Sequence, residues 1–237
     1  MLFDDVYDLL RLVRFNNHDR VEIRNINIQN YSGQTLLMYA IENEEEDECS
    51  TEMVKWLIDK GANLDLQDHD GRTALMYAIM YDHRTIAKSI IVKRANLDLQ
   101  DHGDRTALMY AIEHGKSKIA ALIIEKGANL DLKDKNGKTA LMYAIEHGKS
   151  KIAKLLIEKG ANLDFKDDKG RTALLYAVWY GNKEIEKLIT EKQQEKIQKT
   201  KEEVQKLQEK AKIATVKPYR LTPTQRLLRL RKLHGCR

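Results

Sequence analysis

Two short apolar stripes with helical spacing recur along the middle of the chain, and residues 101–133 show one complete period of the pattern. Within each stripe the residues recur at intervals of three or four, which places them on one face of a helix: Leu108, Ala111 and Ile112, then Ile119, Leu122 and Ile123. Thr106 stands where its hydroxyl can cap the first helix, while Gly115 and Gly127 tolerate the left-handed conformation common at helix C-termini. The pattern predicts two short helices, an extended segment over 128–132, and a polar turn into the next unit.

The phrase T-A-L-M-Y-A opens the first helix of several units at a spacing of 33 residues. It occupies residues 73–78, 106–111 and 139–144, recurs as T-A-L-L-Y-A at 172–177, and has an earlier variant, T-L-L-M-Y-A, at 35–40. Such regular spacing is typical of stacked supersecondary units. Neither helix of a unit can bury its stripe alone, so the neighbouring units must cover it.

This unit resembles the ankyrin repeat, whose consensus joins a D-x-x-G-x-T-P-L-H turn and first helix to a second helix ending in L-L-x-x-G-A-D-V-N. The resemblance covers roughly residues 25–192 and implies an all-α solenoid of helix–turn–helix units joined by β-turn fingers. The consensus Pro is Ala or Leu here and the consensus His is Met or Leu, so the family's Thr–His hydrogen bond cannot form. Arg94 replaces the closing Gly of the second repeat, and the third repeat has its turn glycine shifted to Gly103. These departures predict two locally weaker repeats.

The ends of the chain follow different patterns. Residues 1–24 mix apolar and charged positions and predict a capping helix, residues 25–192 form five repeats, and residues 193–237 form a charged helical extension and a basic amphipathic tail. The polar run to Lys212 has no Gly or Pro, so the last repeat helix is expected to continue through it. The chain has a net charge of +5, but residues 191–237 carry 14 Lys and Arg against 5 Asp and Glu, a net +9 that leaves −4 for residues 1–190. The two parts are therefore expected to have different roles.

Composition also bears on location. Cys49 and Cys236 cannot form a disulfide framework and fit a reducing compartment. No apolar run has the length of a signal peptide or membrane span, so a cytoplasmic location is expected. The repeat variant and the Lys/Ile/Asn-rich composition resemble ankyrin proteins of intracellular bacteria, protists and large viruses, for which the location would be the host cell.

Candidate chemical sites are few. Glu113-His114 and Glu146-His147 could suggest an acid–base or metal pair, but equivalent residues of adjacent repeats lie about 8–10 Å apart, whereas zinc needs its nitrogen ligands at about 2.0–2.1 Å from the ion. No phosphate loop, nucleophile motif or Cys/His cluster is present. The prediction is a non-enzymatic protein with no cofactor, no metal and no small-molecule substrate.

The acidic run Glu42 to Glu48 predicts a hydrated loop, although it could also bind a cation or attract the basic tail.

Partner contact in ankyrin proteins, as the resemblance implies, uses the turn tips and the exposed face of the first helix. Large apolar groups at those positions are the best candidate anchors, since Trp and Tyr dominate interface hot spots: Trp179 and Tyr180 first, then Met80 and Tyr81. An alternative is that Trp179 and Tyr180 pack under the C-terminal extension. The polar candidates on the same surface are His69, Arg72, Arg105, His114, Lys138, His147 and Arg171.

These observations favour a protein–protein interaction module that grips a protein partner, of unknown identity, through its concave ankyrin ridge. The alternative is a tether, in which the basic tail binds anionic membrane or nucleic acid while the repeats carry a protein cargo. Its charged contacts would be Arg226, Arg229, Arg231 and Lys232. The same tail could instead be a cap, a subunit contact, or a docking segment for a larger assembly.

Overall fold

The computed structural model describes residues 25–43, 48–216 and 224. The predicted capping helix over 1–24 and the basic tail residues Arg226, Arg229, Arg231 and Lys232 lie outside this part. The chain divides into two compact units, Met1–Thr190 and Glu191–Arg237.

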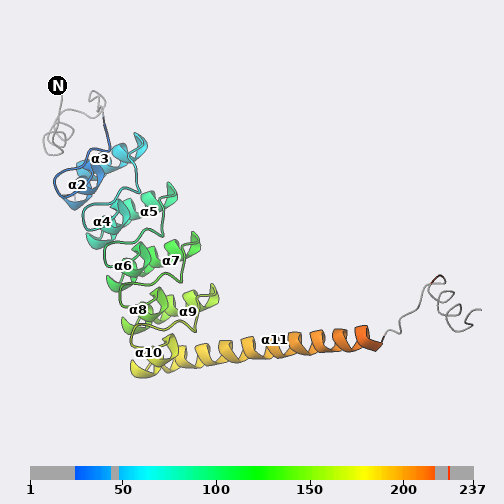
Figure 1. Ribbon diagram of the computed structural model, residues 1–237. Helices are drawn as coiled ribbons and strands as arrows, with labels where there is room; N and C mark the ends of the chain where they lie inside the picture. Colours follow the sequence, from blue (N-terminus) through cyan, green and yellow to red (C-terminus); the bar gives the residue numbers. More distant parts are fainter. Residues whose placement is uncertain (1–24, 44–47, 217–223, 225–237) are drawn as a thin grey trace, which may run out of the picture. The chain divides into compact units, whose positions relative to one another are not determined.

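Helices of two kinds alternate through the first unit, which confirms the predicted all-α fold of helix–turn–helix repeats (Figure 1). The first helices of the repeats are α2 (Leu36–Glu42), α4 (Ala74–Met80), α6 (Ala107–Glu113), α8 (Ala140–Glu146) and α10 (Ala173–Trp179). The second helices are α3 (Glu48–Asp59), α5 (Arg84–Val92), α7 (Ser117–Glu125), α9 (Ser150–Glu158) and the beginning of α11 (Lys183–Val216). Figure 1 shows the first helices stacked in one layer and α3, α5, α7 and α9 in a second.

The first helices begin where the repeated threonine predicts. The Thr106 hydroxyl accepts a hydrogen bond from the backbone N–H of Met109, and the same cap forms at Thr35, Thr73 and Thr172. Thr139 is the exception, because its hydroxyl is buried without a hydrogen-bond partner among the described residues. Each of the five threonines also pairs through a single β-bridge with the residue six positions earlier, which closes a β-turn finger before every first helix.

The core runs continuously through the stack. The apolar residues of the repeated phrase are almost fully buried in the inner repeats, and the second helices add one face each. In α7 the buried residues are Ile119, Ala120, Ile123 and Ile124, whereas Leu122, which we placed in the stripe, is only partly buried. The buried face of α7 is therefore rotated slightly about the helix axis from the face that the sequence pattern predicts.

The acidic run differs from its prediction at both ends. Glu42 is the last residue of α2 and Glu48 the first of α3, so the ends of the predicted loop are helical; residues 44–47 lie outside the described part. Glu42 also accepts hydrogen bonds from Gln34 and Tyr81. This carboxylate is thus part of the repeat structure.

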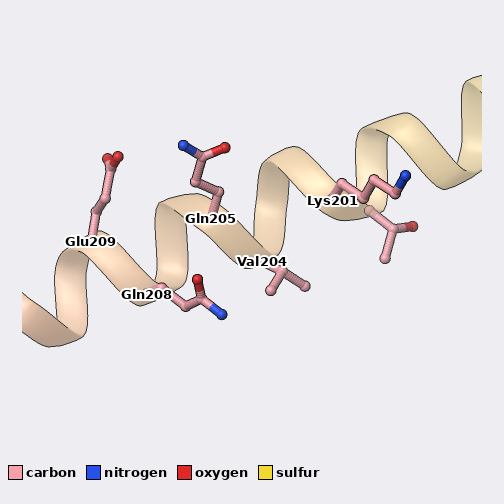
Figure 2. Close-up of a pocket in the computed structure, with 6 residues that line it drawn as sticks. Lys201, Val204, Gln205, Gln208 and Glu209 are labelled. Carbon is pink, nitrogen blue, oxygen red and sulfur yellow. The ribbon is translucent and has the colours of Figure 1, made fainter.

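The second unit is described for Glu191–Val216 of α11 and for Thr224. Ile197, Val204 and Leu207 are exposed on α11. A shallow hollow beside Val204 is lined only by residues of this helix, five of which Figure 2 labels. Among residues 25–43, 48–216 and 224, no second element forms a wall of this hollow, and it does not have the enclosed shape of a ligand site.

Candidate interaction surface

A tyrosine from each of the last four first helices is tied to the finger of its own repeat. The Tyr110 hydroxyl donates to Asp101 Oδ2 over 2.6 Å, and the equivalent bonds are Tyr77 to Asp68 (2.7 Å), Tyr143 to Asp134 (2.9 Å) and Tyr176 to Asp167 (3.0 Å). The other oxygen of Asp101 accepts backbone N–H bonds from Gly103 and Arg105, both at 2.8 Å. Each aspartate therefore holds the turn and the helix in one arrangement. We call the four Tyr–Asp pairs the ladder.

The ladder has perturbed acid–base properties. Burial, followed by the hydrogen bond to Asp101, raises the pKa of Tyr110 to about 12, and burial with the Asp68 bond does the same for Tyr77. Burial alone would raise the pKa of Asp167, but hydrogen bonds from Arg171 and Tyr176 outweigh it and lower the value to about 2. At neutral pH the tyrosines are thus neutral donors and Asp167 is an ionised acceptor.

The basic candidates lie beside the ladder and are already paired. Arg105 donates to Asp101 at 3.0 Å, Lys138 Nζ lies 2.7 Å from Glu146, Arg171 lies 2.6 Å from Asp167, and Arg72 lies 3.0 Å from Asp70. All four side chains are half-buried. They are therefore restrained and hold the turns to the helices as well as facing the surface.

The candidate pairs at the ends of the first helices have a common geometry. The second member of each pair is the C-cap residue, and its ring stacks on the ladder tyrosine one turn earlier, with centroids 6.0–6.1 Å apart: Tyr81 on Tyr77, His114 on Tyr110, His147 on Tyr143 and Tyr180 on Tyr176. Two hydroxyls also reach the preceding repeat. Tyr81 donates to Glu42 over 2.7 Å and Tyr180 to Glu146 over 3.1 Å.

The candidate anchor residues differ in the exposed fraction of their side chains. Trp179 is 67% exposed, Tyr180 50% and Tyr81 41%, whereas Met80 is only partly exposed and packs against the core. The Arg171 guanidinium lies 5.5 Å from the Trp179 ring centroid. His69, on a finger tip, and His114 and His147, at helix ends, are also exposed.

The ladder aspartates were not among the residues singled out in the sequence, and the acceptor glutamates Glu42 and Glu146 were considered only as part of an acidic run and of a Glu–His pair. The available signal was Asp68, Asp101, Asp134 and Asp167, which recur nine positions before the ladder tyrosines at the same spacing of 33. Glu42 and Glu146 differ because they act across a repeat boundary. Only stacking of the repeats brings them to the next repeat's tyrosine.

Within the described residues no group of three or more His, Cys, Asp or Glu side chains could hold a metal ion. Helices with the length and apolar character needed to cross a bilayer were also not found there.

Comparison with known proteins identifies the family. The family model described as ankyrin repeats (3 copies) matches residues 46–134 and 108–201. No curated protein sequence gave a significant match. Among solved structures, a chain of the complex of the predatory endopeptidase Bd0816 from Bdellovibrio bacteriovorus with the immunity protein Bd3460 is 31% identical, with a TM-score of 0.61 over 78% of this chain and 93% of that one. The chain belongs to the ankyrin-repeat family.

Proposed function

We propose that this chain is a non-enzymatic module that binds a protein partner through the exposed ends of its first helices, with Trp179 and Tyr180 as the main anchors. The observation that carries the proposal is the state of these two rings, which are large, exposed and held in place. Ankyrin repeats are generic protein–protein interaction modules, and the family is typically non-enzymatic.

Restraint of the anchors favours tight binding. Tyr180 stacks on Tyr176 and donates to Glu146, so its ring has little freedom to lose when a partner covers it. Rigid aromatic side chains bury much area at a low entropic cost, which is why they dominate hot spots. Met80 and Tyr81 provide a second, smaller apolar position three repeats away, with Tyr81 held by Glu42.

The solved neighbour supports a folded protein as the partner. That structure contains an immunity protein in complex with an endopeptidase, and the neighbour is the immunity protein. A chain of this architecture and similar length can therefore engage the surface of another folded protein. For the present chain a folded protein partner is an inference from this similarity.

The test uses affinity capture with the intact chain, followed by titration of the captured partner against variants. Trp179→Ala combined with Tyr180→Ala should weaken binding by about 2 kcal/mol or more, which is the hot-spot scale and close to thirtyfold in Kd. The matched control is His114→Ala with His147→Ala, which changes the same type of position in the middle repeats and should weaken binding less. Equal affinity of the anchor variant and the parent chain would refute the assignment.

The fold of the anchor variant must be checked independently. Hydrogen exchange of residues 173–192 should match the parent, because both rings are exposed and their contacts, to Tyr176 and Glu146 for Tyr180 and to Arg171 for Trp179, are made at the surface. If the last repeat and α11 lose protection together, the two aromatics are structural residues of the end repeat. That result would contradict their role as anchors.

A further inference from the structure

A row of basic side chains follows the turns that connect the first and second helix of each repeat. We call it the turn edge, and it consists of Arg84, Lys116, Lys118, Lys149, Lys151 and Lys183. The turns are in contact from one repeat to the next. Lys116 Nζ lies 2.8 Å from Asp82 of the preceding repeat, and Asn182 donates to Ser150 over 2.9 Å. The six residues therefore form one continuous surface across repeats two to five.

Most of this charge is not neutralised within the described structure. Arg84 and Lys116 share the single carboxylate of Asp82. Other carboxylates of these helix connections are Glu113 and Glu146, which pair with Arg105 and Lys138, Glu184, which pairs with Lys154, and Glu186 on the first turn of α11. In contrast, Lys118, Lys149, Lys151 and Lys183 form no ion pair in the described part of the chain, and three of them, Lys118, Lys151 and Lys183, are exposed.

The placement of these lysines opposes the local electrostatics. The N-terminus of a helix carries partial positive charge and favours acidic residues. Yet α7 and α9 have no acidic residue in the first turn, and their N-cap residues, Lys116 and Lys149, make no side-chain capping bond. Lys118 and Lys151 add a second cation within the same turns. Lysines at these helix N-termini are locally unfavourable yet recur in two repeats, as is expected where a surface is used for binding.

We propose that the turn edge binds an acidic segment of a partner protein, with one carboxylate over each basic turn. Neighbouring repeats are separated by about 8–10 Å, and in a polyproline II segment, with three residues per turn, every third residue lies on the same face about 9 Å further along. A polyproline II segment with Asp or Glu at every third position therefore matches the row. The proposal assigns a second ligand to residues other than the Trp179 and Tyr180 anchors, so it goes beyond the function proposed above.

Nucleic acid fits the row less well. Every third phosphate of a DNA strand advances about 10 Å along the axis, but the strand completes a turn in about 10 base pairs, so these phosphates point to different sides of the duplex and do not face one row. Single-strand binding surfaces also interleave aromatic side chains with basic ones, whereas the rings beside the two inner turns, His114 and His147, each stack on a ladder tyrosine. The periodicity and composition of the edge both favour carboxylates on a polypeptide.

The test measures binding of fluorescein-labelled poly-L-glutamate to the intact chain by anisotropy at low salt. Lys118→Gln with Lys151→Gln removes two edge charges; Lys126→Gln with Lys159→Gln removes two exposed charges from the other ends of the same helices, α7 and α9. Both variants keep the basic residues at 217–237. We expect the edge variant to bind at least about fivefold more weakly than the parent and the control variant less than about twofold. Equal losses, or no loss in the edge variant, would overturn the proposal.

Two further measurements identify the ligand class and the surface. Poly-L-glutamate should slow hydrogen exchange at residues 115–121 and 148–154, and an absence of protection there would overturn the proposal. A duplex DNA of equal charge should bind more weakly; tighter binding that is lost in the edge variant would assign the edge to nucleic acid and contradict us. Trp179→Ala with Tyr180→Ala should bind poly-L-glutamate like the parent, so the two proposals fail independently.

Discussion

Replacement of Arg94 by glycine should stabilise the second repeat. Arg94 has a φ of +64°, and the equivalent residues of other repeats are glycines with φ of +85° to +88° at Gly61, Gly127 and Gly160. The left-handed conformation costs a residue with a Cβ about 1–2 kcal/mol. Glycine avoids this cost but lowers stability by roughly 0.5–1 kcal/mol, because it gives the unfolded chain more conformational entropy. The expected net gain is about 0.5–1 kcal/mol.

The side chain of Arg94 offers little to offset this gain. It is exposed and makes no hydrogen bond or ion pair within the described residues. For a domain of 150–250 residues, 1 kcal/mol corresponds to about 2–4 °C in Tm. We therefore expect Arg94→Gly to raise Tm by about 1–4 °C in scanning calorimetry and to slow hydrogen exchange over residues 84–105.

Two variants separate backbone strain from side-chain effects. Arg94→Ala keeps the Cβ and should give no gain. Gly127→Ala introduces strain at φ +85°, where an added Cβ would meet no atom within 4 Å, so it should lower stability by about 1 kcal/mol through the backbone alone. An increase of Tm in Arg94→Ala as large as in Arg94→Gly would refute the strain argument, as would an unchanged Tm in Arg94→Gly.

Two other predictions concern the ladder and the caps. The pKa of Tyr110 is about 12 in the fold against 10.0 when unperturbed, so the stability that this residue contributes is fully present below pH 10 and is lost as pH rises toward 12. Urea midpoints should therefore fall over that pH window, and they should fall less steeply in Tyr110→Phe. Equal slopes in the two proteins would count against the ladder. Thr106→Ala should cost about 1 kcal/mol in stability through the lost cap. Thr139→Ala should cost less, because the Thr139 hydroxyl has no hydrogen-bond partner in the part of the chain that the structure describes. Equal losses in denaturant titrations would contradict the difference.

The repeat architecture could be predicted from the sequence because its determinants are local and recur. The Thr caps, the glycines with positive φ and the helical stripes each act within one unit, so a spacing of 33 residues was sufficient to place the helices. The exception at Arg94 could also be predicted, because the equivalent position is glycine in three other repeats. The continuation of α11 followed from a polar run without Gly or Pro.

The contacts of the interaction surface could not be predicted in the same way. Whether Arg105 faces a partner or folds back onto Asp101 depends on side-chain direction, which the spacing of residues does not determine. The link from Tyr180 to Glu146 depends on how one repeat stacks on the next. Glu42 was assigned to a flexible run because charge composition was the only guide, yet its position at the end of α2 places it beside Tyr81.

Near-identity of repeats three and four has opposite consequences for the two proposed surfaces. Residues 107–131 and 140–164 differ only at Ala121/Lys154 and Ile123/Leu156, so their helix ends present the same Glu–His pair twice and cannot by themselves distinguish one folded partner from another. Selectivity there has to come from repeats two and five, which carry Tyr81, Trp179 and Tyr180. At the turn edge the same duplication sets two identical lysine clusters one repeat apart. A partner that recognises the turn edge needs acidic residues at the spacing of the repeats and does not need a unique shape. An acidic segment can therefore bind the turn edge while a folded domain binds Tyr81, Trp179 and Tyr180.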